Sequence, residues 1–435
     1  MNRLIALAFF ATLIAIPTMT LAHEGVRLSA EEGQTWYRGN MHTHSHWSDG
    51  DDYLESIALW YQEHDYQFLV FTDHNVLATV ERWVQVGKTK GGQTAYKKLK
   101  QNFPEWVEER VDGDKLEVRL RQFPEVAARF NKPGEYLLIQ GEEISDRAEG
   151  KPIHMNVHNV EELIAPQGGR TVFETIENNV RAVQAQREAT GKPMFVHLNH
   201  PNFGFAVTAE QLMRVRGERF FEVYNGHPHV ANTGDAEHPG TERIWDIILA
   251  QRIAALDMPI MFGLAVDDGH NYHNIPSRAS EPGRGWVEVL AKELTPEALI
   301  ESLEAGRFYS SSGVALKLVE SSDKQLVVEV EAQPGEEYTI EFVGTRESAD
   351  LTGKPITDDE GKPKHITYTY SDAIGETLQT SQGNSASYTF AGDELYVRAR
   401  ITSSKPHPNP SEVGDFEQAW TQPVRGPAAP KHEHE

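Results

Sequence analysis

The segment Phe68-Leu69-Val70-Phe71-Thr72-Asp73-His74-Asn75 joins a short apolar run to polar side chains that can bind metal. Four similar runs are predicted to be strands: Tyr136–Ile139, Met194–His197, Phe220–Val223 and Ile260–Val266. They are short, β-branched or aromatic, and mostly do not alternate with polar residues. This pattern is typical of parallel strands buried on both faces.

Helical patterns alternate with these runs between about Trp36 and Gly313. The predicted helices are Tyr53–His64, Val172–Ala189, Thr241–Ala254 and Thr295–Ala305. Strands that alternate with helices indicate an α/β sheet or barrel with right-handed crossovers. The charged stretch Val80–Lys132 is partly helical by pattern, for example over Pro104–Val111, and is predicted to be an insertion or lid.

The pattern changes after Val314. Short runs such as Leu326–Val330 and Tyr338–Phe342 are separated by Gly, Pro, Asp and Asn, and several of them alternate. This favours a small antiparallel β-sandwich over residues 314–425. The last segment, Gly426–Glu435, is predicted to be a disordered tail.

Composition excludes several classes of function. The 435 residues include 41 Lys and Arg, 65 Asp and Glu and no Cys, which gives a formal net charge of −24. So acidic a protein repels polyanions, and we expect no binding to nucleic acid. Without Cys there are no disulfides, thiol nucleophiles or iron–sulfur clusters, and any metal must be held by His and carboxylate side chains.

Residues 1–22 have the pattern of a secretory signal peptide. Arg3 precedes the apolar stretch Leu4–Ile16, and Thr20-Leu21-Ala22 offers small residues before a cleavage site. The apolar stretch is shorter than the roughly 20 residues that span a membrane, so no stable membrane anchor is expected. The mature protein is predicted to begin near His23 and to be exported, to the periplasm or the extracellular space.

Histidine and acidic residues form five groups, each at a predicted strand end. They are His42-Thr43-His44 with Asp49, Asp73-His74, Glu142-Glu143 with His154, His197 with His200, and Asp267-Asp268 with His270. In extended backbone, residues i and i+2 point the same way, so His42 and His44 can share a metal. Asp73 could orient a ligand imidazole. Five such groups at carboxyl ends of strands predict a multinuclear metal site.

These motifs resemble a known family. His42-Thr43-His44 with Ser48-Asp49-Gly50, Thr72-Asp73-His74, Gly141–Ser145, His200-Pro201 and Asp268-Gly269-His270 are similar to the successive motifs of the polymerase and histidinol phosphatase (PHP) metallohydrolases. The resemblance covers roughly Tyr37 to Gly313, which makes residues 23–313 a PHP-like domain. It implies a distorted (β/α)7 PHP-type barrel with two or three divalent metals at the strand C-termini. The run from Gly285-Trp286 to Gly313, with the β-domain after it, looks like the exported branch that includes carbaryl hydrolases.

Carried over to this sequence, the resemblance implies a role for each ligand. His42, His44 and Asp268 would hold a first metal, Glu143 would bridge it to a second, His154 and His200 would complete the second, and Asp49, His74 and His270 would hold a third. Glu142 is the alternative to Glu143, although the spacing to Ile144-Ser145 favours Glu143. Asp267 is the alternative to Asp268, which the family's D-x-H spacing favours. Glu143, Asp268 and His270 are expected to be catalytic, and Asp73, His197, Asn225 and Arg284 to support the ligands or contact substrate.

The expected function is that of an exported metal-dependent hydrolase of a small molecule. Imidazole with carboxylate suits Zn, Mn or Fe, and ions sharing a carboxylate make a bridging hydroxide available at neutral pH. A phosphoesterase, either phosphatase or phosphodiesterase, leads because family members with known activity mostly cleave phosphoesters. A carbamate, ester or amide hydrolase at the same site is the alternative, and a non-catalytic metal-binding protein is the weaker one. Arg278, Arg284 and Arg307 are the nearest basic candidates for binding phosphate.

Overall fold

A computed structural model of the chain describes residues 27–30 and 33–430. The predicted signal peptide and its cleavage site lie outside these described residues. Within the described part of the chain, no helix has both the length and the apolar character needed to cross a membrane.

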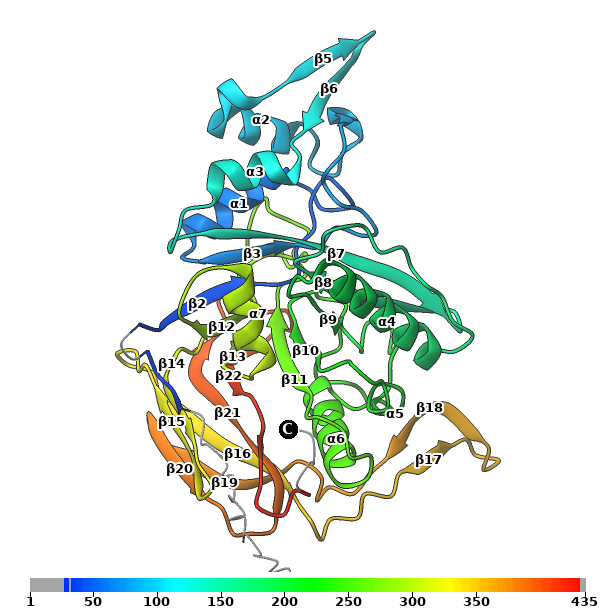
Figure 1. The fold of residues 1–435 in the computed structure, drawn as a ribbon, viewed down its shortest axis with the longest axis vertical. Coiled ribbons are helices and arrows are strands. Elements are labelled where there is room, and N and C mark those ends of the chain that lie inside the picture. The colour runs from blue at the N-terminus through cyan, green and yellow to red at the C-terminus, as the bar shows by residue number, and fades with distance from the viewer. Residues whose placement is uncertain (1–26, 31–32, 431–435) are drawn as a thin grey trace, which may run out of the picture.

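One mixed sheet of fourteen strands forms the centre of the molecule (Figure 1). Its order is β11 (Phe262–Val266), β10 (Phe220–Asn225), β9 (Phe195–Leu198), β8 (Lys151–His158), β7 (Leu137–Ala148), β3 (Phe68–Phe71), β2 (Thr35–Asn40), β12 (Trp286–Ala291), β13 (Phe308–Ser311), β22 (Phe416–Thr421), β21 (Glu394–Pro406), β16 (Tyr338–Arg346) and β19 (Glu376–Gln382), with β23 (Val424–Arg425) beside β21. Strands β2, β3 and β7 are parallel, as are β9, β10 and β11. Strand β8 is antiparallel to β7 and β9, and β12 is antiparallel to β2 and β13. The sheet expected to be parallel is therefore mixed.

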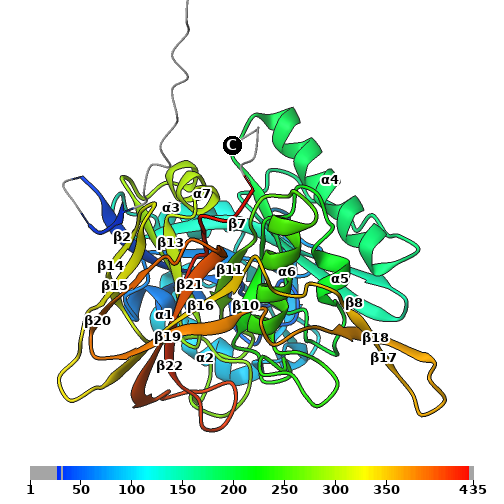
Figure 2. The same cartoon turned by 90° about the horizontal axis from the view of Figure 1, so that it is seen from below.

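The helices pack against this sheet and the insertion. They are α1 (Leu54–Glu63), α2 (Gly92–Asn102), α3 (Phe123–Phe130), α4 (Val172–Thr190), α5 (Ala209–Leu212), α6 (Thr241–Ala254) and α7 (Pro296–Glu304), with 3-10 turns η1 (Val86–Lys88) and η2 (Pro104–Trp106). Four of them, α1, α4, α6 and α7, lie where the sequence predicts helices. The Thr295 hydroxyl accepts a hydrogen bond from the Ala298 backbone N–H and so caps α7. In Figure 2, α4 lies at the edge of the molecule, whereas α6 packs against β10 and against β16 and β21 of the C-terminal part.

Apolar side chains fill the inside of the curled sheet. Phe220, Phe262 and Phe308 meet there from β10, β11 and β13, with ring centroids 5.5 Å apart for the first pair and 5.9 Å for Phe262 and Phe308. The sheet returns on itself at β13, where the Ser310 hydroxyl donates to the Gly263 carbonyl and faces the Ala265 backbone N–H, both of β11. A side chain, not a backbone ladder, joins these two strands. The predicted (β/α)7 barrel therefore takes the coarser form of a curled mixed sheet.

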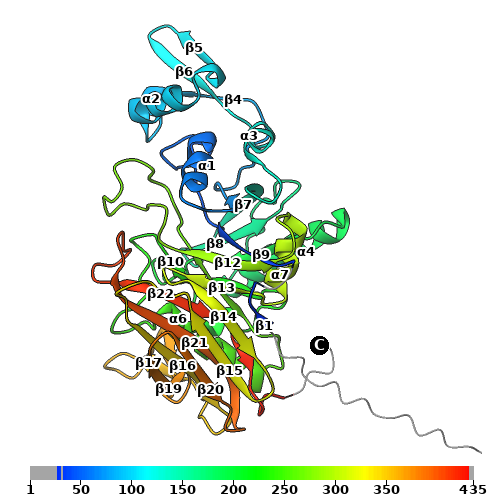
Figure 3. The ribbon, with the colours of Figure 1, turned by 90° about the vertical axis from the view of Figure 1, so that its left-hand side faces the viewer.

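The predicted insertion lies at one end of the molecule and shares an apolar core with α1 and β3 (Figure 3). It contains α2, α3 and a three-stranded sheet of β4 (Arg82–Gln85), β6 (Lys115–Leu120) and β5 (Glu109–Asp112). The segment Pro104–Val111, expected to be helical, instead contains η2 and the start of β5. The reason is a tight turn: Gly113, at φ +65°, folds β5 back onto β6 so that Asp112 pairs with Lys115.

The C-terminal part, from residue 314 on, is joined to the rest by hydrogen bonds between strands. Strand β22 pairs with β13, so the predicted boundary near residue 313 does not interrupt the sheet. A second sheet contains β1 (Arg27–Leu28), β14 (Leu316–Ser321), β15 (Gln325–Val330) and β20 (Ser385–Thr389), and a separate hairpin contains β17 (Lys354–Thr357) and β18 (Pro363–Thr369). Buried residues of β14 and β15 share an apolar core with those of β16, β21 and β22. Two antiparallel layers therefore meet here, and one of them continues the central sheet.

The start of the predicted tail is ordered by hydrogen bonds to β21. The backbone N–H of Gly426 donates to the Leu395 carbonyl, and that of Ala428 donates to the Glu394 carbonyl. The expectation of disorder is therefore wrong for residues 426–430, because backbone groups on β21 pair with them. Residues 431–435 lie outside the described residues.

Candidate metal centre

All nine predicted ligands come together at one place in the fold. His42, His44 and Asp49 follow β2, His74 follows β3, Glu143 and His154 lie within β7 and β8, His200 follows β9, and Asp268 and His270 follow β11. The sequence predicted Glu143 and His154 at strand ends, and the structure places both inside strands instead. They belong to a hairpin in which Ser145 pairs with His154 and Glu143 pairs with Asn156.

Four donor atoms lie close together at the buried side of this centre and are called the cage below. They are Nε2 of His42, Nε2 of His44, Oε2 of Glu143 and Oδ1 of Asp268. The five distances that join a histidine to another of these atoms are 3.1, 3.4, 3.3, 3.2 and 3.3 Å. Each carboxylate oxygen forms with the two histidine nitrogens a triangle whose sides allow one ion to lie about 2.0 Å from all three atoms, which is the length of a Zn–N bond. The cage therefore has the size and the ligand types of a metal site.

Orphaned polar atoms mark three points of the centre. Oε2 of Glu143, Nδ1 of His154 and Oδ1 of Asp49 are buried and have no hydrogen-bond partner among the described residues. An unpaired buried polar atom is costly, and metal coordination would satisfy each of the three. Each atom belongs to a different one of the three predicted ions, so the donor set fits two or three divalent metals.

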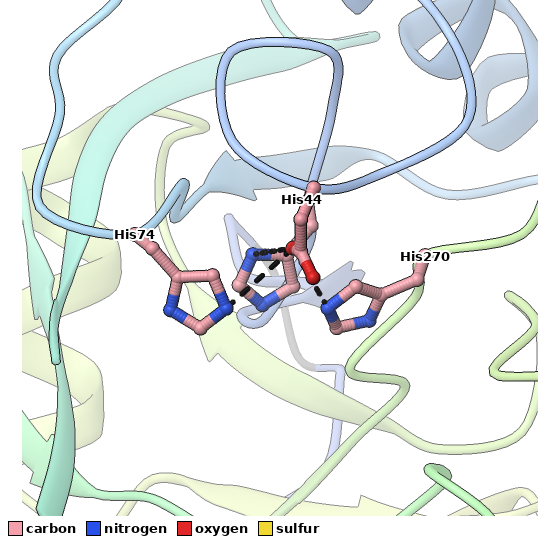
Figure 4. Close-up of side chains that lie close together, drawn as sticks. His44, His74 and His270 are labelled. Carbon is pink, nitrogen blue, oxygen red and sulfur yellow. Dashed lines mark ion pairs between the residues drawn. The ribbon is translucent and has the colours of Figure 1, made fainter. Parts of the chain in front are cut away.

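The second and third ligand groups are more open than the cage. Oε1 of Glu143 lies 2.9 Å from Nδ1 of His154 and 3.6 Å from Nε2 of His200. Oδ1 of Asp49 lies 3.1 Å from Nε2 of His270 and 3.5 Å from Nε2 of His74. Figure 4 shows His44, His74 and His270 pointing toward one another from three separate segments.

In each of the acidic pairs Glu142-Glu143 and Asp267-Asp268, one side chain faces the centre and the other points away. Glu142 points away from the centre, where its carboxyl accepts a hydrogen bond from the Ile164 backbone N–H. Asp267 also points away and accepts hydrogen bonds from the Tyr61 hydroxyl and from the Arg284 backbone N–H. Only Glu143 and Asp268 of these four residues reach the ligand histidines.

The backbone is strained where ligands turn inward. His200 and Asp268 have φ values of +23° and +51°, in the left-handed region that costs energy for residues other than glycine. Gly50, next to Asp49, packs so tightly that a Cβ there would lie 2.4 Å from the His44 carbonyl oxygen. These positions bring the loop after β2 and the segments after β9 and β11 close to one another.

The electrostatics of the centre keep its carboxylates ionised. Burial alone would raise the pKa of Glu143, but His74, His154 and His42 hold it well below its usual range. Burial would likewise raise the pKa of Asp268, which His42, His44 and His270 hold well below normal. Both ligands are therefore anionic at neutral pH, as a cation site requires.

Glu222 is a functional candidate that the sequence analysis missed. Oε1 of Glu222 lies 2.6 Å from Nδ1 of His42 and 3.1 Å from Nε2 of His197, while its Oε2 accepts from the His200 backbone N–H at 2.6 Å and from Asn225 at 2.7 Å. This contact leaves Nε2 of His42 free to face the cage. The only signal in the sequence is a single acid inside the apolar run Phe220–Val223.

The expected supporting residues His197 and Asn225 lie beside the ligands. His197 shares Oε1 of Glu222 with His42, and its Nδ1 lies 2.9 Å from Nε2 of His158. The Asn225 amide donates to Glu222 and, at 3.2 Å, to Oδ2 of Asp268. Both residues therefore contact groups that hold or support ligands.

Asp73 works through a serine instead of contacting an imidazole. Its carboxylate accepts hydrogen bonds from the backbone N–H and the hydroxyl of both Ser45 and Ser48. The Ser48 hydroxyl lies 3.4 Å from Nδ1 of His44. The expectation of a direct Asp73–imidazole contact is corrected, because the turn after His44 places serines between them.

Arg284 does not line the centre. Its side chain is fully buried, and the guanidinium donates to the Gly226 carbonyl, to Glu281 and to Asn409 of the C-terminal part. It holds segments together, so the expectation that it contacts substrate is corrected. Arg307 forms an ion pair with Glu301.

Comparisons with known proteins give low similarities. No family model and no curated protein matches the chain. Several solved structures resemble it, and two of them are described here. One is a two-domain protein from Bacteroides vulgatus ATCC 8482 containing a predicted PHP-like metal-dependent phosphoesterase, with 15% identity, a TM-score of 0.39, and 90% of this chain and 96% of that chain covered. The other, from Bifidobacterium adolescentis ATCC 15703, is assigned as a metal-dependent phosphoesterase, with 13% identity, a TM-score of 0.26, and 53% and 87% covered. Both TM-scores are low, so neither similarity assigns this chain to a family.

Proposed function

We propose that this protein is a metal-dependent hydrolase of the PHP type and that it cleaves phosphoesters of a small molecule. The observation that carries the proposal is the cage of His42, His44, Glu143 and Asp268, with its orphaned Glu143 oxygen. Imidazole nitrogens and ionised carboxylates at these distances repel one another unless a cation or a proton lies between them, and a divalent cation would satisfy all four atoms at once. A centre of this kind uses no serine or thiol nucleophile.

The residues of the chain have separate roles in this proposal. Divalent ions, when bound, supply an activated water and polarise the bond to be cleaved. Glu143 shares its two oxygens between the cage and the His154 side, and Asn199 holds one of them through a 2.8 Å hydrogen bond. Glu222 orients His42, and Asp49 with His74 and His270 forms the side that solvent reaches.

Charge favours an anionic substrate over a neutral carbamate. Three dications would bring six positive charges against the four carboxylates Asp49, Glu143, Glu222 and Asp268. The centre would then be cationic despite the acidic surface. Salt screens the charges of that surface over about 8 Å, so they act weakly at the centre. The burial of Arg284 is an observation on the other side, since this arginine is not available to bind a phosphate.

A substrate panel on metal-reconstituted protein tests the choice. We expect a higher kcat/KM for p-nitrophenyl phosphate or bis-p-nitrophenyl phosphate than for an aryl carbamate, and competitive inhibition by inorganic phosphate at millimolar levels, because a phosphate can bridge metals. Faster carbamate turnover without phosphate inhibition would make the protein a carbamate hydrolase of the carbaryl-hydrolase branch. No turnover of any of them by metal-loaded protein would favour a binding function.

We propose also that residues 1–22 direct export to the periplasm or the extracellular space, with cleavage near His23. Arg3, the apolar stretch after it and the small residues at 20–22 support this. Mass spectrometry of protein from fractionated cells should find a mature N-terminus near His23 outside the cytoplasm. A cytoplasmic protein that keeps Met1 would contradict export.

A further inference from the structure

One side of the metal centre is open to solvent, and the rest is closed. The side chains of Asp49, His74, His154 and His270 are 43%, 28%, 18% and 14% exposed, whereas His42 and Glu143 are fully buried. Substrate can therefore reach the metals over the ligands that face solvent, which include Asp49 and His270. The polar groups that flank these two residues decide which substrates fit.

The insertion places a lysine beside Asp49. Nζ of Lys90 lies 3.0 Å from Oδ2 of Asp49, whose other oxygen faces the ligand histidines. The Lys90 side chain is 56% exposed. An ammonium group has three N–H donors, and no described residue other than Asp49 accepts from this one. Lys90 therefore offers a positive charge and free donors at the entrance.

The position of Lys90 is fixed by the docking of the insertion. Gly91 packs against the loop after β2, where a Cβ would lie 1.9 Å from the Asp51 carbonyl oxygen. Farther along α2, Nζ of Lys98 lies 2.6 Å from Asp52 and also donates to the Tyr272 carbonyl. The loop that carries Asp49 is thus held by the same segment that carries Lys90.

A histidine flanks the centre on the side of His270. The His227 ring lies 5.7 Å from the His270 ring, edge to face. Nδ1 of His227 accepts a hydrogen bond of 3.1 Å from the His229 backbone N–H, which assigns the proton to Nε2. No described residue accepts a hydrogen bond from Nε2, so this donor is also free.

We propose that Lys90 and His227 form a subsite for the terminal oxygens of a phosphomonoester. The inference rests on the proposed phosphoesterase function and narrows its substrate class. A monoester brings up to two negative charges and three terminal oxygens, enough to contact the metals, the ammonium and the imidazole N–H. A diester has one charge and fewer free oxygens, so it gains less from Lys90.

The test uses the full-length, metal-loaded protein and inorganic phosphate as the probe. Lys90→Gln removes the charge, Lys90→Arg keeps it, and Lys88→Gln makes the same charge change two residues away on an exposed side chain with no contact to Asp49. His227→Ala removes the imidazole donor, and His227→Gln keeps an N–H donor. Calorimetry gives the Kd for phosphate, and elemental analysis gives the metal content of each variant.

We expect Lys90→Gln and His227→Ala to raise the phosphate Kd about tenfold each, the effect of one charge-assisted hydrogen bond. Lys90→Arg, His227→Gln and Lys88→Gln should stay close to wild type, and metal content should not change. In kinetics, Lys90→Gln should raise KM more for p-nitrophenyl phosphate than for bis-p-nitrophenyl phosphate.

Two results would overturn the subsite. One is an unchanged phosphate Kd in either loss variant. The other is a loss of phosphate affinity in Lys90→Gln that is matched by an equal loss of bound metal. Lys90 would then act only by holding Asp49 in place. A wild type that hydrolyses phosphoesters while its Lys90→Gln variant binds phosphate normally refutes the subsite alone. A wild type that binds phosphate through Lys90 and His227 but cleaves no phosphoester refutes the proposed function and leaves an anion site.

Discussion

Replacing Glu143 by glutamine should deprive the protein of bound metal and of activity together. One oxygen of Glu143 is a corner of the cage, and the other lies 2.9 Å from His154. The amide keeps the shape but removes the negative charge that pairs with the dications. We expect at least about a 10³-fold loss of kcat/KM, because metal ions supply several kcal/mol of transition-state stabilisation. Elemental analysis of the purified variant checks the metal loss, and chelator treatment of the wild type should reproduce it.

Glu142→Gln is the matched control for this experiment. Burial raises the pKa of Glu142 to about 8, so its carboxyl is mostly protonated at neutral pH and the amide is close to it in shape and charge. Its one hydrogen bond, from the Ile164 backbone, can be kept by the amide oxygen. The variant should hold metal as the wild type does. If Glu142→Gln is the metal-poor protein, Glu142 is the ligand and the assignment of Glu143 is wrong.

Glu222→Gln should weaken metal binding without removing any ligand. Each oxygen of Glu222 accepts from two donors: His42 and His197 at one, the His200 backbone and Asn225 at the other. An amide necessarily turns its NH₂ group toward one of these pairs and leaves both donors without an acceptor. Loss of a supporting carboxylate typically costs about 10- to 100-fold in metal affinity, and a buried unsatisfied group costs about 1–3 kcal/mol of stability. Competition with a coloured chelator measures the first effect, and thermal unfolding measures the second.

Glu218→Gln provides the comparison, since Glu218 is buried just before the same strand. Burial raises the pKa of Glu218 to about 8, and its carboxyl accepts a hydrogen bond from the Phe220 backbone N–H. The substitution should leave metal affinity unchanged. Equal losses in both variants would mean that Glu222 acts on general stability and does not orient His42.

Much of the centre could be predicted because ligand chemistry is local in sequence. His42-Thr43-His44 and Asp268-Gly269-His270 carry their metal-binding character in the residue types and spacing, and apolar runs precede them. Helices α4 and α7 were predictable for a similar reason, since a threonine cap stands before each. The absence of Cys from the composition is enough to exclude thiolate ligands.

Contacts between distant segments could not be predicted in this way. Strand β8 contains too few consecutive apolar residues to stand out, and it is defined by its pairing with β7. Glu222 acquires its role from two histidines 180 and 25 residues away. Arg284 donates a hydrogen bond to Asn409, which is 125 residues away in the sequence. Each of these depends on which strands become neighbours.

The two acidic doublets show where the sequence stops and the tertiary structure decides. Side chains alternate along a strand, so Asp268 continues the inner face of Phe262, Leu264 and Val266, and Glu143 continues that of Ile139. Asp267 and Glu142 therefore face outward. Strand β11 is apolar at every position, because it is covered on both faces, and such a strand does not reveal which alternate set points inward. The sequence alone determined that each strand delivers a carboxylate to the centre. The family resemblance favoured Glu143 and Asp268, but the physical reason lies in the tertiary structure, because the curling of the sheet decides which alternate set of side chains faces inward.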